Sequence, residues 1–408
     1  MSKKLQVLLL TSSLVIIVFA VAGGLGVHAS PSTNNDGAYT HMQVYSEVLY
    51  RIRTEYVEEP NMSTVTNGAL HGLLESLDAN SSYLSPAEYK VFKQKKAEGK
   101  ASIGAVVSKR FGYAAVVSVI PGGPADKANI SSGDIIETID GQNSHDLSLA
   151  EIKSRLVGET GSRLECSIIR ARKVEPQKIT IIREIVNPPA VKAQMLADNT
   201  GYIKSVVLTK DKVQEVADKI KSLQKDGAKK LVLDLRNTAE GDEEAGVATA
   251  NLFLGKGLIA YLQGQKFPKV IYNAEADKKI TDLPLVVLVN RGTAGPAEIV
   301  AAAVLDNARG DVLGDKTFGD GSVQKLLEVP DGSALILSIA KYYTPQGKII
   351  QETGITPNIQ VASVDDLVLP DDEDNSTNPE ETQKPQSKED EQLRRAIEVL
   401  NNKAKKAS

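Results

Sequence analysis

Several residue types that commonly carry structure or chemistry are scarce in this 408-residue sequence. A single cysteine, Cys166, excludes an intramolecular disulfide and any cysteine-rich metal site, and its apolar neighbours indicate a small core residue. There is no tryptophan, and the last of only four histidines is His145. Lys and Arg number 48 against 52 Asp and Glu, so no basic excess points to a nucleic-acid partner. We expect no metal and no organic cofactor.

The N-terminus has the pattern of an export segment. Lys3 and Lys4 precede a largely apolar run over residues 5–27. A basic start followed by an apolar stretch is typical of a secretory signal, and Val27-His28-Ala29 is a candidate cleavage site. A run of about 20 apolar residues also suffices to cross a bilayer, which would leave the lysines in the cytoplasm. We predict an exported bacterial protein, periplasmic or otherwise extracytoplasmic, with residues 1–29 favoured as a retained membrane anchor over a cleaved signal.

With 41% hydrophobic residues, the rest of the chain can form several packed domains. Apolar residues recur at helical spacing over residues 38–99, which predicts a helical lead-in domain. His41 and His71 are expected on helix surfaces or half-buried faces of this domain rather than as ligands. Residues 364–408 are acidic and proline-punctuated at first, which predicts a solvated linker followed by a terminal amphipathic helix.

Residues 100–187 contain short β-branched segments separated by glycine-containing turns, which indicates a β-rich domain with short helices. The segments 121–128 (PGGPADKA) and 133–141 (GDIIETIDG) together resemble the centre of a PDZ domain. That resemblance implies an open sheet edge to which an extended peptide adds as a strand. It also implies a loop whose backbone N–H groups hold the terminal carboxylate of the peptide. The candidate peptide-binding residues are Ser102, Ile103, Gly104 and Ala105. The alternative is a β-rich domain that binds nothing.

Residues 188–363 alternate between strand and helix patterns. The runs 231–235 and 283–289 are almost entirely apolar, as expected of strands that are buried on both faces. Each run precedes a helix-like segment, at residues 244–254 and 297–307. Strand followed by helix, more than once, predicts an α/β core.

Three motifs in this core carry a specific resemblance. They are Val-Asn-Arg-Gly-Thr-Ala at 289–294, Leu-Gly-Asp-Lys-Thr-Phe-Gly-Asp-Gly-Ser-Val-Gln at 313–324, and Ala-Lys-Tyr-Tyr-Thr-Pro at 340–345. In this order, and after a helical lead-in and a PDZ-like unit, they resemble the carboxy-terminal processing peptidases, or tail-specific proteases, over residues 40–363. The resemblance implies a multidomain α/β protein: an N-terminal helical segment, a PDZ domain and a crotonase/Clp-like peptidase core. It also implies a serine-type endopeptidase with a Ser/Lys dyad, whose PDZ domain recognises C-terminal tails of substrates.

The sequence departs from the family pattern at the positions that carry the chemistry. Gly295 occupies the position of the nucleophilic serine, and Asp320, twenty-five residues later, occupies that of the lysine base. Pro296 has no backbone N–H to donate to an oxyanion. Glu240 lies in the turn that would supply the second oxyanion donor, whereas the accompanying glutamine is retained as Gln324.

These replacements predict a protein without peptidase activity. Loss of a nucleophile or base in a comparable triad costs about 10⁴–10⁶ in rate, and loss of one oxyanion donor about 10²–10³. We therefore expect an exported protein that binds protein C-terminal tails or unfolded proteins, or docks an active peptidase relative, and does not cut them.

The alternative is an active serine-type endopeptidase that acts on envelope proteins with a relocated nucleophile. Thr293, with Lys316 as its base, is the candidate pair. A Ser-His-Asp triad is excluded in the core because no histidine follows residue 145. For Thr293 we favour a structural role, as the cap of a helix that begins near Pro296.

Overall fold

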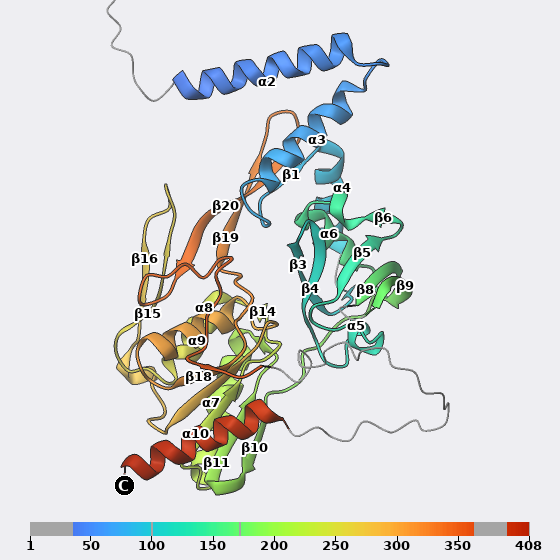
Figure 1. Cartoon of the computed structure of the whole chain (residues 1–408). Coiled ribbons are helices and arrows are strands. Elements are labelled where there is room, and N and C mark those ends of the chain that lie inside the picture. Colours follow the sequence, from blue (N-terminus) through green and yellow to red (C-terminus); the bar gives the residue numbers. More distant parts are fainter. Residues whose placement is uncertain (1–35, 99–100, 171–172, 363–389, 408) are drawn as a thin grey trace, which may run out of the picture. The chain divides into compact units, whose positions relative to one another are not determined.

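The computed structural model describes residues 36–98, 101–170, 173–362 and 390–407 (Figure 1). The predicted export segment and most of the predicted acidic linker lie outside the described residues. Among the residues that are described, no helix is long and apolar enough to cross a membrane. The chain divides into two compact units, residues 1–66 and residues 67–408.

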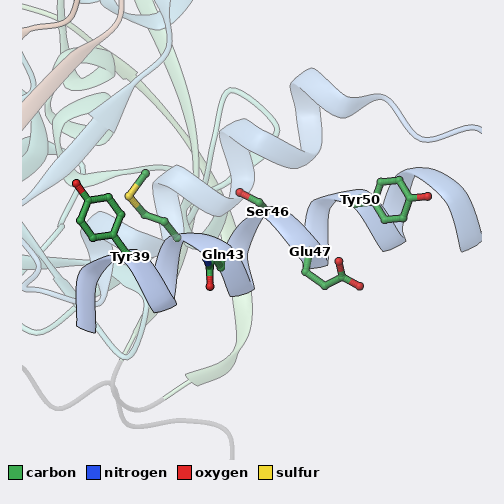
Figure 2. Close-up of a pocket in the computed structure, with 6 residues that line it drawn as sticks. Tyr39, Gln43, Ser46, Glu47 and Tyr50 are labelled. Atoms are coloured by element: carbon green, nitrogen blue, oxygen red, sulfur yellow. The ribbon is translucent and has the colours of Figure 1, made fainter. Parts of the chain in front are cut away.

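Helix α2 (Asp36–Glu55) makes up most of the described part of the first unit. Several of its large side chains are exposed: Tyr39, Met42 and Tyr50 are 62–64% exposed. Figure 2 shows Tyr39 and Tyr50 near the two ends of a shallow surface that this helix presents on its own. Arg51 forms ion pairs with glutamates one turn before and one turn after it, which stabilises the exposed helix.

The helical segment continues with α3 (Met62–Glu75) and α4 (Pro86–Glu98). These helices confirm the predicted N-terminal helical segment. Between them lies a short strand, β1 (Ser82–Leu84), which pairs with a strand of the core more than 240 residues later. Its three residues are buried, so the lead-in is joined to the core by a sheet as well as by the chain.

A six-stranded antiparallel sheet forms the β-rich domain. Five of its strands follow the order β3-β4-β5-β8-β9, so that β3 is an edge strand, and β6 pairs with β5. Ile136, Ile152 and Leu164, from two strands and helix α6, are fully buried in its core. The elements are β2 (Ala101–Ser102), β3 (Ala105–Arg110), β4 (Tyr113–Val119), α5 (Pro124–Lys127), β5 (Ile135–Ile139), β6 (Gln142–Asn143), η1 (Ser144–Asp146), α6 (Leu149–Leu156), β7 (Val157–Gly158), β8 (Arg163–Arg170) and β9 (Lys173–Ile182).

A second sheet forms the base of the core, in the order β10-β11-β13-β17-β18-β21, parallel except for the pair β10–β11. Its elements, with the helices between them, are β10 (Lys192–Leu196), η2 (Ala197–Asn199), β11 (Thr200–Lys204), α7 (Lys210–Lys225), β13 (Lys230–Asp234), α8 (Glu243–Asn251), β17 (Leu285–Val289), α9 (Pro296–Asp306), β18 (Asp311–Gly314) and β21 (Ile359–Gln360). Two short strands that follow β11 and β13 in the chain, β12 (Val207–Leu208) and β14 (Glu240–Gly241), form a separate parallel pair.

Both faces of the parallel sheet are covered, as the apolar runs predict. Leu231 and Leu233 belong to the core cluster that includes residues of α7, α8 and α9. Val232, between them, belongs to a separate cluster with Ala396 and Leu400 of the terminal helix α10 (Glu391–Ala407). Alternate residues of one strand thus contact helices on opposite faces.

An antiparallel sheet completes the core. It has the order β1-β20-β15-β16, and β19 also pairs with β20. Its core strands are β15 (Leu258–Gln263), β16 (Val270–Asn273), β19 (Ser322–Glu328) and β20 (Ala334–Tyr343), with the short helix η3 (Ala276–Lys278) after β16. No pattern in the sequence predicted this sheet. The structure agrees with the predicted multidomain α/β architecture.

Candidate active site

The positions to which the family resemblance assigns the nucleophile, the base and the oxyanion donors lie on three loops at one edge of the parallel sheet. The loops follow β13, β17 and β18, which are adjacent parallel strands, so their carboxyl ends meet. A hydrogen bond from the Phe318 N–H to the Thr293 carbonyl (2.9 Å) ties the loop after β18 to the loop after β17. The structure therefore brings together the positions that the sequence spacing singled out.

Gly295 forms the sharp turn between β17 and α9. Its backbone has φ 56° and ψ −120°, a conformation that residues with a side chain rarely adopt. A Cβ built on Gly295 would lie 3.7 Å from the Ala239 carbonyl oxygen and 3.9 Å from the Asp320 carbonyl oxygen. There is thus space for a serine side chain, and the cost of placing one there is backbone strain.

The environment of this turn offers few donors to an oxyanion. Pro296 is the first residue of α9 and has no N–H. The residue before the turn, Ala294, donates its N–H to the Thr238 carbonyl (2.9 Å). The Ala239 carbonyl oxygen lies close to where a side chain at position 295 would begin. A hydrogen-bond acceptor at this place would repel the negative charge that develops on an oxyanion.

Glu298 links positions 295 and 320, where the family resemblance places the nucleophile and the base. It is the third residue of α9 and its side chain is completely buried. Its carboxylate accepts N–H hydrogen bonds from Gly295 (3.0 Å), Gly319 (2.8 Å) and Asp320 (2.8 Å), and another from the hydroxyl of Thr317. Burial nevertheless raises the pKa of Glu298 to about 8.

Asp320 lies among other acidic and amide groups. Its Oδ1 is 3.5 Å from Nδ2 of Asn80, which also donates to the Ser322 hydroxyl (2.9 Å). Burial and then the charge of Asp320 raise the pKa of Glu243, at the start of α8. Position 320 therefore carries a carboxylate near another carboxylate, and it has no amine that could act as a base.

The other predicted positions lie at the margins of the site. Gln324, on β19, is exposed and donates to the Ser322 hydroxyl (2.8 Å), so it shares a partner with Asn80. Glu240, on β14, is exposed as a residue, but the protein atoms around its carboxyl group desolvate it and raise its pKa. Gln324 is therefore connected to Asp320 indirectly, through Ser322 and Asn80.

The candidate substitute pair is not assembled. Thr293 is completely buried; its hydroxyl donates to the Leu235 carbonyl (2.8 Å) and accepts the Asn290 N–H (3.0 Å). Lys316 is exposed on the loop after β18. The expectation that Thr293 caps α9 is wrong, because Gly295 is the N-cap residue and Thr293 instead fixes the preceding turn.

Comparisons with known proteins agree with this architecture. Residues 199–361 match peptidase family S41, and residues 116–170 match the PDZ domain. A carboxy-terminal-processing protease of Bartonella bacilliformis is 33% identical over 357 residues, which cover 85% of this chain and 82% of that relative. A carboxy-terminal processing protease of Bacillus subtilis is 33% identical over 322 residues, covering 78% of this chain and 69% of the relative.

The chain belongs to the carboxy-terminal processing protease family. The solved structure of a photosystem II D1 C-terminal processing protease is similar to it, with a TM-score of 0.65 and 26% sequence identity over 78% of this chain and 92% of the other. These comparisons confirm the predicted family and the multidomain α/β fold with a PDZ domain.

The PDZ domain of this family member has its candidate peptide-binding residues at the start of β3. Ile103 and Gly104 are buried, and Gly104 has φ 72°, which separates β2 from β3. The Ser102 N–H donates to the Glu184 carbonyl (2.9 Å), and the Gly104 N–H donates to the Ser102 hydroxyl (3.1 Å). Two of the predicted carboxylate-binding amides thus already have partners within the chain.

The edge of β3 is better suited to a peptide than this loop. The Ile120 N–H donates to the Gly104 carbonyl (2.9 Å), and β4 pairs with β3 from Ala105 to Arg110. Since β3 is the last strand of its sheet, its opposite side has no neighbouring strand in the described sheet. Helix α6 lies against β3.

Sequence reasoning assigned no role to three residues of the family site: Asn80, Glu243 and Glu298. Glu298 was visible in the sequence as an acidic residue in an otherwise apolar helix. Its position three residues after Gly295 is that of a residue that bonds back to the N-cap N–H. Asn80 comes from the lead-in segment, and no local pattern connects it to Asp320.

Proposed function

We propose that this member of the carboxy-terminal processing protease family binds protein or peptide C-termini and does not hydrolyse them. The observation that carries the proposal is the turn at Gly295, where the nucleophile position has no hydroxyl and faces two carbonyl oxygens. The Asp320 carboxylate replaces a neutral amine as base. Three of the four parts of a Ser/Lys mechanism (nucleophile, base and the N–H after the nucleophile) are therefore missing at one place.

The geometry of Thr293 argues against the alternative of a relocated nucleophile. A hydroxyl that is buried and already donates to a backbone carbonyl cannot reach a substrate without unfolding the turn. No observation favours proteolysis by Thr293 with Lys316 over the inactive state.

The binding half of the proposal depends on the edge of β3. An extended peptide that adds to this edge would form main-chain hydrogen bonds on one side, with α6 beside it. Because two loop amides have partners within the chain, we expect the strand pairing to contribute more than capture of the carboxylate. The partners would be protein C-terminal tails or unfolded proteins, and an active peptidase relative could also present such a tail.

Cleavage by the full-length protein tests the first half of the proposal. An unfolded protein with an apolar C-terminus is incubated with the purified chain, and its mass is followed by mass spectrometry. We expect the substrate to remain intact. Cleavage that is lost in Thr293→Ala or Lys316→Ala would establish a relocated active site and overturn the proposal.

Binding is tested separately, by fluorescence polarisation with a labelled apolar peptide that carries either a free or an amidated C-terminus. We expect both forms to bind, the free carboxylate more tightly. No binding of either form would leave a protein with neither proteolytic nor PDZ function, and the binding half would be wrong.

We also propose that the protein is exported and held at the membrane by residues 1–29, on the basis of their basic start and apolar run. Cell fractionation of a C-terminally tagged chain, with mass determination of its N-terminus, tests this. Recovery in the cytoplasmic fraction would contradict export, and a mature N-terminus at Ser30 would contradict the anchor.

A further inference from the structure

Three potential metal ligands from three helices meet beside the PDZ domain. They are His71 on α3, Glu88 on α4 and Glu151 on α6. One ligand atom from each lies within 4.8 Å of the other two, and His71 Nε2 is 3.3 Å from Glu88 Oε2. All three residues are half-buried, so the cluster is enclosed by protein and still open to an entering ion.

Both carboxylates are held in place by hydrogen bonds at the start of their helices. Glu88 Oε2 accepts the Ser85 N–H (2.7 Å), and Glu151 Oε2 accepts the Ser148 N–H (3.0 Å) and the Ser148 hydroxyl (2.9 Å). Such outer hydrogen bonds orient carboxylates that ligate metals, and each carboxylate keeps further lone pairs. The ring of His71 is likewise fixed, edge-on to the buried ring of Tyr83 at 5.4 Å.

The distance between His71 and Glu88 is informative. A direct hydrogen bond between an imidazolium and a carboxylate is typically about 2.7–2.9 Å long, shorter than the 3.3 Å observed. Two ligands of a tetrahedral zinc ion, each about 2.0–2.1 Å from the metal, are separated by about 3.3–3.4 Å. The two atoms therefore stand at the spacing of neighbouring ligands.

We propose that His71, Glu88 and Glu151 bind a divalent transition-metal ion of the Zn²⁺ class, with water as the fourth ligand. One imidazole and two carboxylates form a donor set that suits such an ion. Glu75, one turn after His71, is not counted as a ligand because its carboxylate pairs with Lys109 (2.6 Å). The ion joins three helices, so its role is structural, and the proposal does not rest on the proposed function.

Cobalt(II) is the probe, because four-coordinate Co²⁺ absorbs strongly in the visible range. The full-length protein, prepared without a histidine tag and stripped with a chelator, is titrated at neutral pH. We expect one equivalent to bind with a four-coordinate spectrum and Zn²⁺ to displace it.

Variants assign the ligands. His71→Ala and Glu151→Gln should weaken binding by more than about 100-fold, because even loss of outer hydrogen bonds commonly costs 10–100-fold. Ser148→Ala, which removes one such bond, should fall in that intermediate range. His41→Ala is the matched control: His41 is exposed on α2, and its loss should leave binding unchanged.

Two results would overturn the proposal. One is that the wild-type protein fails to bind one equivalent of Co²⁺ at neutral pH. His71 and the two glutamates would then interact with one another without binding a metal ion. The other is equal binding by wild type and His71→Ala, which would place the ion elsewhere.

Discussion

Glu298 should give this protein an unusual dependence of stability on pH. Its carboxyl group is completely buried, and burial raises its pKa from an ordinary value of 4.5 to about 8. Between these two values the folded state holds a proton that the unfolded state has released. Because the folded pKa is the higher one, the stabilising effect is complete below about pH 4.5 and is lost as the pH rises through about 8.

The magnitude follows from the size of the shift. One pKa unit corresponds to about 1.4 kcal/mol, so the free energy of unfolding should fall by about that amount per pH unit between the two pKa values. A shift of this size amounts to roughly 5 kcal/mol over the whole interval. Since small domains are stable by only about 5–15 kcal/mol, the effect should be easy to detect.

Urea unfolding of the full-length protein, at intervals between pH 5 and about 9, measures this slope. Other ionisable groups contribute to the same pH dependence, so the difference between wild type and Glu298→Gln is the quantity of interest. The variant should be less stable at pH 5, because an amide cannot accept all four hydrogen bonds, but its slope should be flatter by about 1.4 kcal/mol per unit. Glu244→Gln, at an exposed position on α8, should retain the wild-type slope.

The result that would contradict this prediction follows from the hydrogen bonds to Glu298. Four donors point at the Glu298 carboxylate, and together they favour its charged form. If Glu298→Gln leaves the slope unchanged, or if wild type gains stability relative to the variant as the pH rises, these donors outweigh burial. The reasoning given for Glu298 would then be refuted.

Three further predictions concern the same edge of the sheet. Gly295→Ser should fold but lose about 1–3 kcal/mol, measured by calorimetry, because φ 56° is strained for any residue with a Cβ; an unchanged melting temperature would contradict this. The triple variant Gly295→Ser, Pro296→Ala, Asp320→Lys should cleave an unfolded protein slowly, while the Asp320→Lys variant alone should not. Its rate should stay about 10²–10³-fold below that of an intact family enzyme, because the second oxyanion donor is still missing. Arg236→Ala should cost about 3–5 kcal/mol in urea unfolding, because it leaves the fully buried Asp234 carboxylate without its guanidinium partner; a loss below about 1 kcal/mol would be inconsistent with that pairing.

The sequence was most informative where a feature is local. The apolar runs predicted β13 and β17 because a strand buried on both faces needs no polar residue. The spacing of twenty-five residues between Gly295 and Asp320 identified two positions that the fold brings within reach of each other. Helix α6 is one of the short helices expected in the β-rich domain, with Ser148 and Glu151 forming its capping box.

It was least informative where distant segments meet. The strand β1 and Asn80 come from a segment predicted to be helical, yet one pairs with β20 and the other contacts the loop of Asp320. The break at Gly104 depends on a positive φ value, which no periodicity reveals. The three helices that bring His71 to Glu88 and Glu151 are likewise joined by tertiary packing, so no sequence pattern indicated His71 as a ligand.

The construction of the site is compatible with the proposed loss of its chemistry. Glu298 binds the loops around positions 295 and 320 through backbone N–H groups, which are present whatever side chains these positions carry. Replacing a nucleophile and a base therefore removes none of these hydrogen bonds. At position 295, a glycine even relieves the strain that a serine would impose at φ 56°. Active sites commonly carry such strain at a cost in stability, so the proposed loss of catalysis at this turn is expected to stabilise the protein.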